Sequence, residues 1–393
     1  MKKLNVDAVV LDLRHLTEET LAAYDQCEMD AVFALTNPQA QVLLSQYGVK
    51  LNVVQSIHCE EDVETTTING KATLDGTSIP EKKRVMVVNG KLSVKPDGVK
   101  ALEQYCGIVV NGKLYCPESL ASVVTAKCTV NGKLCLYPDD AVILNSTTRL
   151  DKVFLLRAQP KLYWAEKVFI AVDPKLDAEA LAAKGARFSS QKAILTERNA
   201  EILAPLFTEE TELVILPEGT AVLDDDLELR AATLRRYGDR LYVMGDVIVP
   251  EEGRKVLEQL TYLHADGDVL LSATLEEPFY TIPELEYGTL RLLKGRAIVG
   301  KPMLRLGKEM LQLYPEGIAC VGCAMVTLDA ALEPDTIAKK LTFEGCAMVK
   351  CTALQENAVN AVSKDVAQIC VPEDAEKRRD DGTVKLNGIQ LTL

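Results

Sequence analysis

The chain has 393 residues, 48% of them hydrophobic, and a formal net charge of −13 at pH 7. This acidity argues against binding to nucleic acid or to an anionic membrane surface. The sequence contains no apolar run of the roughly 18–20 residues that a membrane span requires, so we expect neither a membrane span nor a nucleic-acid partner.

Eleven cysteines are spread along the chain at irregular spacing. The residues after Met1 include two lysines and then a mixed polar and apolar stretch, which is not the pattern of a signal peptide. Free thiols are typical of a reducing compartment. We therefore expect a cytoplasmic protein rather than a framework of disulfides.

Strands and helices are expected to alternate from the start of the chain. The apolar segments Asp7–Leu11 and Asp30–Leu35 are strand candidates that begin 23 residues apart. Each leads into a helix-like segment, Thr17–Tyr24 and Pro38–Tyr47 respectively, and Gly48 is positioned to cap the second helix. This order predicts a repeating unit of strand and helix.

An Asn-Gly-Lys motif makes the repeat explicit. A short β-branched run precedes the motif in the clearest copies, and a second short run, a proline and an acidic residue follow it. The four copies have glycines 20, 22 and 20 residues apart, and they are Asn69-Gly70, Asn89-Gly90, Asn111-Gly112 and Asn131-Gly132. A constant step of this length is typical of stacked repeats, each of which buries its apolar face against its neighbours.

Two local structures are compatible with Asn-Gly at these positions. The pair turns the chain sharply because glycine tolerates positive φ, so it serves either as a tight hairpin or as a corner between two stacked strands. Recurrence at a fixed step favours the corner. The proline and acid that follow predict the first turn of a short helix.

The remaining sequence continues the repeating unit, except for one segment with a different pattern. Residues 150–238 are expected to be more helical and irregular, with helices predicted over 190–203 and 227–236. Further corners are predicted at Gly245, Gly322, Gly345 and Asn387-Gly388. Gly322 and Gly345 are 23 residues apart, and Gly388 lies 43 residues after Gly345, which is the length of two units.

The predicted fold is thus a repeat solenoid of stacked short parallel strands, with an Asn-Gly corner and a short helix in most turns of about 20–23 residues. We expect one continuous array over 1–393. It consists of N-terminal repeats in 1–149, the irregular middle in 150–238 and C-terminal repeats in 239–393.

This unit resembles two repeat classes. The order of residues resembles a leucine-rich repeat, in which a strand, an asparagine corner, an apolar pair and a proline-led helix recur; it is carried by Val85, Val87, Asn89, Leu92, Val94 and Pro96. Asn-Gly comes one position early for that class, and valine and isoleucine replace most leucines. The unit also resembles a parallel β-helix, including bactofilin-like bacterial polymers, although these lack the acidic helical segment. Either resemblance implies architecture only.

Four cysteines have the spacing of a metal-ligand set. Cys320 and Cys323 form a C-x2-C pair, and Cys346 and Cys351 form a C-x4-C pair after 22 intervening residues. Thiolates in this pattern hold zinc or an iron–sulfur cluster. However, Cys323 and Cys346 each follow a repeat glycine, so stacked turns would bring them about 4.8 Å apart as a ladder of buried thiols. We favour the ladder, with a metal centre or a redox pair as alternatives.

Other charged groups have equally simple interpretations. His15, His58 and His264 are scattered and lack a nucleophile motif, so they are interpreted as surface or hydrogen-bonded histidines. The run 224–226 of three aspartates suits a hard cation or, as we prefer, the cap of a helix beginning near Leu227.

Basic residues form two further groups. One has helical spacing, which indicates pairing with acids more than an anion site, and comprises Arg230, Arg235, Arg236 and Arg240. The other follows Asn-Gly in each clear copy, as Lys71, Lys91, Lys113 and Lys133. It predicts a basic stripe, which is interpreted as a charged rim that protects a sheet edge or, alternatively, as a track for an acidic ligand. Phosphate-binding glycine patterns are absent from the sequence, and no cofactor is expected.

The sequence favours a non-catalytic scaffold that binds a protein partner or itself. A self-assembling polymer is the first alternative, because the first turn (Asn5–Leu11) and the last (Leu386–Leu393) are apolar and carry no evident cap. A β-helix enzyme acting on a saccharide is the second alternative. It would require acids and a basic residue gathered in one groove.

Overall fold

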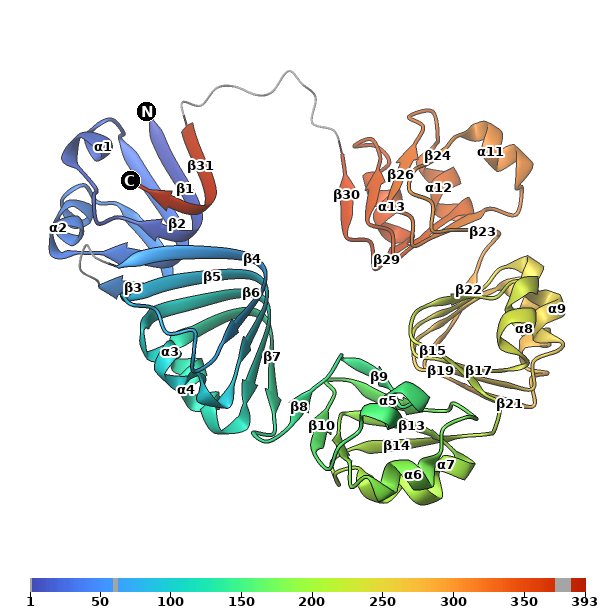
Figure 1. Ribbon diagram of the computed structural model, residues 1–393. Coiled ribbons are helices and arrows are strands. Elements are labelled where there is room, and N and C mark those ends of the chain that lie inside the picture. The colour runs from blue at the N-terminus through green and yellow to red at the C-terminus, as the bar shows by residue number, and fades with distance from the viewer. Residues whose placement is uncertain (1, 59–62, 372–382) are drawn as a thin grey trace. The chain divides into compact units, whose positions relative to one another are not determined.

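The computed structural model describes residues 2–58, 63–371 and 383–393. Many short parallel strands lie in parallel sheets, with short helices between them (Figure 1). The described chain forms two compact units. The first comprises 2–143, Lys161–Trp164 and the C-terminal strand; the second comprises Leu144–Pro160 and 165–371.

The first sheet of the first unit carries both ends of the chain. Its order is β3-β2-β1-β31, with all pairs parallel, and its strands are β1 (Lys3–Asp12), β2 (Gln26–Thr36), β3 (Lys50–His58) and β31 (Thr383–Thr392). Helices α1 (Glu18–Ala22) and α2 (Pro38–Gln46) follow β1 and β2. Each helix begins at a polar cap, because Thr17 accepts from the Thr20 amide and Asn37 from the Ala40 amide.

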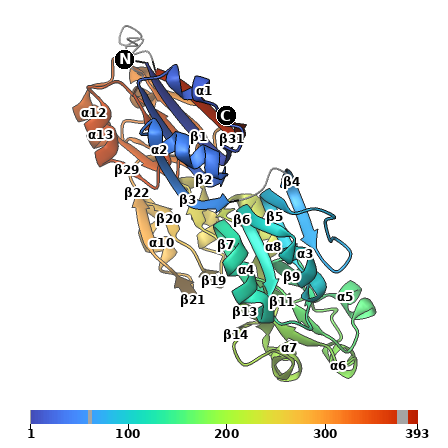
Figure 2. The same ribbon diagram turned by 90° about the vertical axis from the view of Figure 1, so that its left-hand side faces the viewer.

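The position of β31 corrects the expectation that Asn387-Gly388 forms the last turn of the array. Strand β31 pairs with β1 from Lys3 opposite Thr383 to Asp12 opposite Thr392, and Figure 2 shows the two strands side by side. The two apolar ends that lack caps in the sequence therefore cover one another.

The second sheet contains the four clear Asn-Gly motifs. Its order is β4-β5-β6-β7, with strands β4 (Glu64–Leu74), β5 (Arg84–Val94), β6 (Tyr105–Pro117) and β7 (Cys128–Tyr137). Short helices follow β5 and β6, namely η1 (Pro96–Gly98), α3 (Val99–Glu103), η2 (Glu118–Leu120) and α4 (Ala121–Lys127).

The register of this sheet aligns every Asn-Gly with the next. Asn69, Asn89, Asn111 and Asn131 lie opposite one another, as do their glycines, in parallel pairs. Parallel pairing excludes the hairpin. The structure differs from the predicted corner in one respect, because each strand continues through its motif and only the glycine takes positive φ.

The two central strands of the second sheet, β5 and β6, are buried on both faces near their N-terminal ends. Met86 and Val88 point toward the side of α3 and pack with Leu102, whereas Val85 and Val87 pack against the first sheet. Beyond the motif, a small aromatic cluster joins Tyr115 and Tyr137 to Trp164. Trp164 lies on β10 (Leu162–Trp164), which pairs with β8 (Val142–Ile143).

The second unit begins with a four-stranded parallel sheet. Its order is β14-β13-β11-β9, with strands β9 (Thr147–Arg149), β11 (Val168–Ala171), β13 (Lys192–Thr196) and β14 (Glu212–Leu216). The intervening elements are α5 (Lys152–Arg157), α6 (Ala178–Ala183), β12 (Arg187–Ser189), α7 (Glu197–Leu203) and η3 (Ala204–Leu206).

Two sheets follow that share a core. One has the order β15-β17-β19-β21, with β15 (Ala221–Leu223), β17 (Arg240–Val243), β19 (Tyr262–Ala265) and β21 (Glu284–Tyr287). The other has the order β16-β18-β20-β22, with β16 (Leu227–Glu228), β18 (Val247–Val249), β20 (Val269–Ser272) and β22 (Leu290–Leu293).

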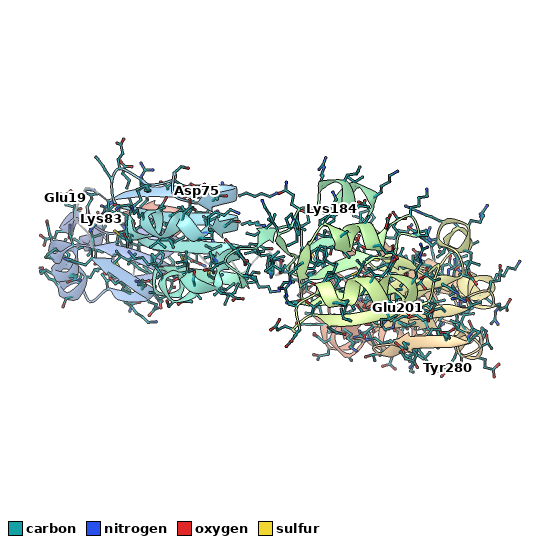
Figure 3. The ribbon with its side chains drawn as sticks, turned by 60° about the horizontal axis from the view of Figure 1, so that its bottom comes forward. Glu19, Asp75, Lys83, Lys184, Glu201 and Tyr280 are labelled. Carbon is teal, nitrogen blue, oxygen red and sulfur yellow. The ribbon has the colours of Figure 1, made fainter. Side chains whose placement is uncertain are left out.

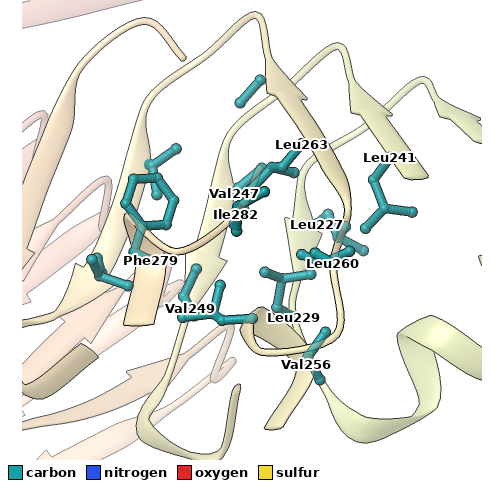
Figure 4. Close-up of a cluster of buried hydrophobic side chains, with 14 of the residues drawn as sticks. Leu227, Leu229, Leu241, Val247, Val249, Val256, Leu260, Leu263, Phe279 and Ile282 are labelled. Carbon is teal, nitrogen blue, oxygen red and sulfur yellow. The ribbon is translucent and has the colours of Figure 1, made fainter. Parts of the chain in front are cut away.

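Short helices complete this core, which Figure 4 shows in close-up. They are α8 (Ala231–Tyr237), η4 (Glu251–Gly253), α9 (Arg254–Leu257), η5 (Ala273–Leu275) and α10 (Glu276–Phe279). Leu241, Leu263, Val247 and Val249 from the strands belong to the same buried cluster as Phe279 of α10.

The last two sheets repeat the same plan. One has the order β23-β25-β27-β29, with β23 (Arg296–Val299), β25 (Ile318–Val321), β27 (Leu341–Glu344) and β29 (Ser363–Lys364). The other has the order β24-β26-β28-β30, with β24 (Leu304–Leu306), β26 (Met325–Leu328), β28 (Met348–Lys350) and β30 (Gln368–Cys370). Their helices are α11 (Lys308–Leu313), α12 (Pro334–Lys340) and α13 (Glu356–Ala361).

Two long helices predicted for the middle of the chain are shorter than expected. The segment predicted as a helix over 190–203 contains strand β13 and then α7, and that over 227–236 contains strand β16 and then α8. Apolar runs such as Ala193–Leu195 suit either element locally, and pairing with neighbouring strands selects the strand. Residues 150–238 therefore carry strands as well as helices.

In the second unit the predicted corners separate two strands. Gly322 lies between β25 and β26, and Gly345 between β27 and β28, both with φ of 59°. The amide of Gly322 donates to the carbonyl of Glu344, so the corners stack through backbone hydrogen bonds. Gly245 lies between β17 and β18 without positive φ.

Together these sheets have a repeat-like architecture of short parallel strands. No helix in the described part of the chain is long and apolar enough to cross a membrane.

Candidate functional site

The densest group of titratable side chains lies in the second unit. Tyr242, His264 and Glu286 occupy one row across strands β17, β19 and β21, because their Cα atoms are register partners. Asp266 follows β19, and Lys192 begins β13 of the neighbouring sheet. We call these five residues the Asp266 cluster.

Asp266 is the centre of this cluster. Its Oδ1 accepts from the Tyr242 hydroxyl at 2.7 Å and lies 3.2 Å from His264 Nε2, and its Oδ2 accepts from Lys192 Nζ at 3.0 Å. The other ring nitrogen of His264, Nδ1, lies 2.7 Å from Glu286 Oε2. The His264 ring stacks on Tyr242 with centroids 4.5 Å apart.

The electrostatics of the cluster keep Asp266 ionised. Burial alone would raise the pKa of Asp266, but hydrogen bonds from His264, Tyr242 and Lys192 outweigh it and hold this pKa at about 2. Burial, and then the bond to Asp266, raise the pKa of Tyr242. The carboxylate is therefore charged throughout the physiological range.

The cluster has acids and bases from successive turns, which is the arrangement that a saccharide-cleaving enzyme requires. A glycosidase needs a carboxylic acid whose pKa is raised, so that it protonates the leaving group. Asp266 has the opposite shift, and both nitrogens of His264 already contact carboxylates. A shallow depression of about 500 Å³ beside it is lined by His264, Asp266, Glu286 and Tyr287. This geometry suits a bridge between two sheets better than proton transfer.

A second polar group surrounds Arg291 of β22. Its guanidinium bonds to Asp268, to Glu344 at 2.9 Å and to Asp365 at 3.2 Å. Asp365 has φ of 53° at a corner where the neighbouring turns have glycine, a conformation that aspartate tolerates better than most residues. Arg291 ties successive sheets together, and no pattern in the sequence identified it.

The four candidate thiols are buried, and Cys346 contacts two of the other cysteines, because its thiol bonds to that of Cys323 and donates to the carbonyl of Cys320 at 3.4 Å. Cys323 and Cys346 occupy equivalent corners, and the Ala347 amide donates to the Cys323 carbonyl. Their contact lowers the pKa of Cys323 and raises that of Cys346. Cys320 lies in a strand row opposite Phe343. Cys351 follows β28, where its amide donates to the carbonyl of Cys370.

Among the residues that the structure describes, no group of three or more histidine, cysteine or acidic side chains is arranged to hold a metal ion. The arrangement of Cys323 and Cys346 is that of a ladder between adjacent turns.

The aspartate run near Leu227 has a different role from the one predicted. Leu227 begins a strand, so no helix starts there. Asp226 accepts from the amide of Asp246 at 2.8 Å, Asp246 accepts in turn from the amide of Asp268 at 2.8 Å, and Asp224 pairs with Arg149. These carboxylates stabilise the corners of stacked turns.

The predicted basic stripe lies in register across the second sheet. Lys71, Lys91, Lys113 and Lys133 are partners in successive strands, as are the asparagines two positions before them. The asparagines form a hydrogen-bonded ladder in which each Nδ2 donates to the Oδ1 of the preceding turn, at 2.8–2.9 Å. Lys91 lies 3.9 Å from the ring centroid of Tyr115.

The other sequence candidates remain dispersed. His15 is exposed and so is His58. Arg230 pairs with Glu228, and Arg236 stacks near Tyr237. These contacts do not converge on one site.

An exposed apolar edge is the remaining candidate surface. Two rows of side chains run through the sheet β9–β14, from Phe169 to Ala193 to Leu213 and from Ala171 to Leu195 to Ile215. The residues of the inner strands are fully buried, whereas Leu213 is 40% and Ile215 is 54% exposed. Charged side chains such as Glu19, Lys83 and Glu201 project elsewhere over the surface (Figure 3). The core of this sheet thus continues to the surface at β14.

Comparison with protein-family models, curated proteins and solved structures finds no match to this chain.

Proposed function

We propose that this protein is a non-catalytic scaffold that binds partner proteins along stacked parallel strands. We also propose that the chain is a solenoid with turns of about 20–23 residues, which resembles leucine-rich repeats and parallel β-helices. The in-register sheets support this interpretation. Repeat arrays of this kind present long, regular surfaces to partners.

The observation that carries the proposal is the apolar edge at β14. In a repeat protein, a terminal turn that caps the core has polar residues on its outer face. Leu213 and Ile215 instead continue two buried rows into solvent, beside charged neighbours. Contiguous apolar surface rimmed by polar residues is typical of a site for protein binding.

A saccharide-cleaving enzyme is the second candidate, and the Asp266 cluster is the observation that favours it. Acidic and basic side chains from β19, from β21 and from β13 of the neighbouring sheet meet there. The low pKa of Asp266 and its bonds to three partners favour the scaffold, since neither a free general acid nor a free base is present in this cluster.

The two candidates are separated by one pair of measurements. Immobilised wild-type chain and an Asp266→Asn variant are exposed to extract from the source cells, and retained proteins are quantified by mass spectrometry. The same two proteins are incubated with neutral and acidic polysaccharides, and new reducing ends are measured.

The scaffold proposal expects proteins retained at near-stoichiometric amounts by both forms and no release of reducing ends. Release of reducing ends by the wild type that the Asp266→Asn substitution abolishes would overturn it in favour of the enzyme.

A further inference from the structure

The outer edge of β14 has backbone groups directed away from its sheet. The amide of Glu212 donates to the Gln191 carbonyl at 3.1 Å, which fixes the residues that face β13. Because a parallel strand directs alternate residues to opposite neighbours, the amides and carbonyls of Leu213 and Ile215 face outward. Among the described residues, no strand pairs with this edge.

A cavity adjoins the same strand. It has a volume of about 620 Å³ and is lined by Leu213 together with Pro205 and Phe207, which follow α7. An apolar side chain placed beyond Leu213 would contact Pro205 and Phe207, while polar and charged residues form the rest of the wall. The edge therefore offers both backbone hydrogen bonds and a pocket with an apolar patch, which are the two elements of recognition by strand addition.

The rim of this surface is predominantly acidic. Glu209 and Glu210 line the cavity, Glu212 is exposed on β14, and Arg187 is the basic residue in the lining. Electrostatic complementarity then selects a partner with positive charge at the corresponding positions.

We propose that the β14 edge binds an extended segment of a partner protein as an additional strand. The segment carries apolar side chains at alternate positions, which cover Leu213 and Ile215, and basic residues that face Glu209 and Glu210. The spacing follows from the period of two along a strand, since Leu213 and Ile215 lie on the same face. This inference rests on the proposed scaffold function and specifies the chemistry of one partner.

A synthetic peptide tests this surface directly. The probe is a nine-residue peptide of alternating valine and threonine, flanked at each end by two lysines and labelled for fluorescence anisotropy. A second peptide of the same sequence is N-methylated at alternate residues, so that it cannot pair along one edge. A third has glutamates in place of the lysines.

The variants separate the backbone, apolar and charge contributions. Ile215→Pro removes an outward amide without removing a bond to β13, because proline is tolerated where the amide of an edge strand faces solvent. A double variant, Leu213→Ser with Ile215→Ser, removes the apolar contacts. Leu156→Ser on α5 is the matched control, since Leu156 is 71% exposed in the same unit but lies outside this surface. Circular dichroism and thermal unfolding establish that each variant folds.

Wild type and Leu156→Ser are expected to bind the lysine-flanked peptide equally. Ile215→Pro and the double serine variant should weaken binding at least tenfold, as should N-methylation or glutamate flanks of the peptide. Absence of saturable binding to the wild type, or equal binding by the β14 variants, would overturn the β14 proposal and leave the scaffold function standing, because protein retention from extract tests that function separately.

A second copy of the chain is the competing occupant of this edge. Light scattering without peptide would then show a mass that rises with concentration in the wild type and not in Ile215→Pro. That result would also overturn binding of a partner segment.

Discussion

In the second sheet, the Asn-Gly glycines of β5, β6 and β7 each lie against the glycine of the preceding strand. A Cβ atom at Gly112 would lie 2.1 Å from the carbonyl oxygen of Gly90, and one at Gly132 would lie 2.0 Å from that of Gly112. Gly70, in the first strand of the sheet, has nothing within 4 Å of its Cβ position. All of these glycines have positive φ. The stack therefore requires glycine for close packing at the inner turns and for conformation at every turn.

Substitution by alanine separates these two causes. Gly70→Ala should reduce the free energy of unfolding by about 1–3 kcal/mol through its unfavourable φ alone. Gly112→Ala should cost roughly 2 kcal/mol more, because the added methyl overlaps a backbone carbonyl that cannot move without breaking the ladder. Denaturant unfolding followed by circular dichroism measures both. Equal effects of the two substitutions would contradict the steric account.

The stability of the second unit depends on the ionisation of Asp266. Its pKa in the folded chain is about 2, below the ordinary value of 3.8. A lowered pKa stabilises the fold above the unfolded value, and that contribution disappears as the pH falls from about 4 to about 2. Asp266→Asn should therefore reduce the free energy of unfolding by roughly 2 kcal/mol at neutral pH, and less as the pH approaches 2.

Urea unfolding at pH 7, 4 and 2.5, monitored by hydrogen exchange in β13 and β19, checks this dependence. Glu286→Gln is the control, because the Glu286 side chain is 72% exposed and its pairing should contribute little. A difference between wild type and Asp266→Asn that stays constant down to pH 2.5 would contradict the role assigned to Asp266.

At the scale of elements, the C-terminal strand determines how the first sheet ends. Leu386 and Leu391 of β31 pack on the core formed by β1, β2 and the first helices, and the Leu393 amide donates to the Asp12 carbonyl. Without β31, one edge of β1 would present unpaired amides and carbonyls to solvent. The strand thus completes the sheet as well as covering it.

Removal of 383–393 should speed amide exchange in β1 and leave β25 and β27 unchanged. Hydrogen–deuterium exchange with mass spectrometry measures both regions in the same sample. Val384→Ser is the control, because Val384 is 40% exposed and its side chain contributes little to the core. Unchanged protection of β1 after the truncation would show that β31 does not close this sheet in solution.

The features that can be predicted from the sequence are those that recur at a constant step along the chain. The in-register stacking of Asn89 on Asn111, and the corners at Gly322 and Gly345, follow from a repeated motif with a constant step. The helix-like segments predicted after the first two strands correspond to α1 and α2.

Features that depend on distant contacts are not encoded in any local pattern. The pairing of β31 with β1 joins the two ends of the chain, and the bond from Lys192 to Asp266 joins residues 74 positions apart. The boundary between strand β13 and helix α7 is not encoded locally either, because the apolar run before Thr196 suits both elements. Tertiary pairing decided each of these cases.

At the scale of the whole molecule, one plan recurs through both units. Parallel strands stack in register, corners are held by backbone hydrogen bonds or aspartates, and short helices cover the apolar faces. Such an array tends to self-associate where an edge is long and apolar. In this chain β31 covers β1, whereas the β14 edge is open and rimmed by acids.

The distinction between a scaffold for other proteins and a self-assembling polymer is therefore a question of mass in solution. Size-exclusion chromatography with light scattering, over a wide range of concentrations, measures it most directly. A scaffold should keep the mass of a single chain, 43.0 kDa, at every concentration. A mass that grows steadily with concentration would contradict the scaffold account and support polymerisation.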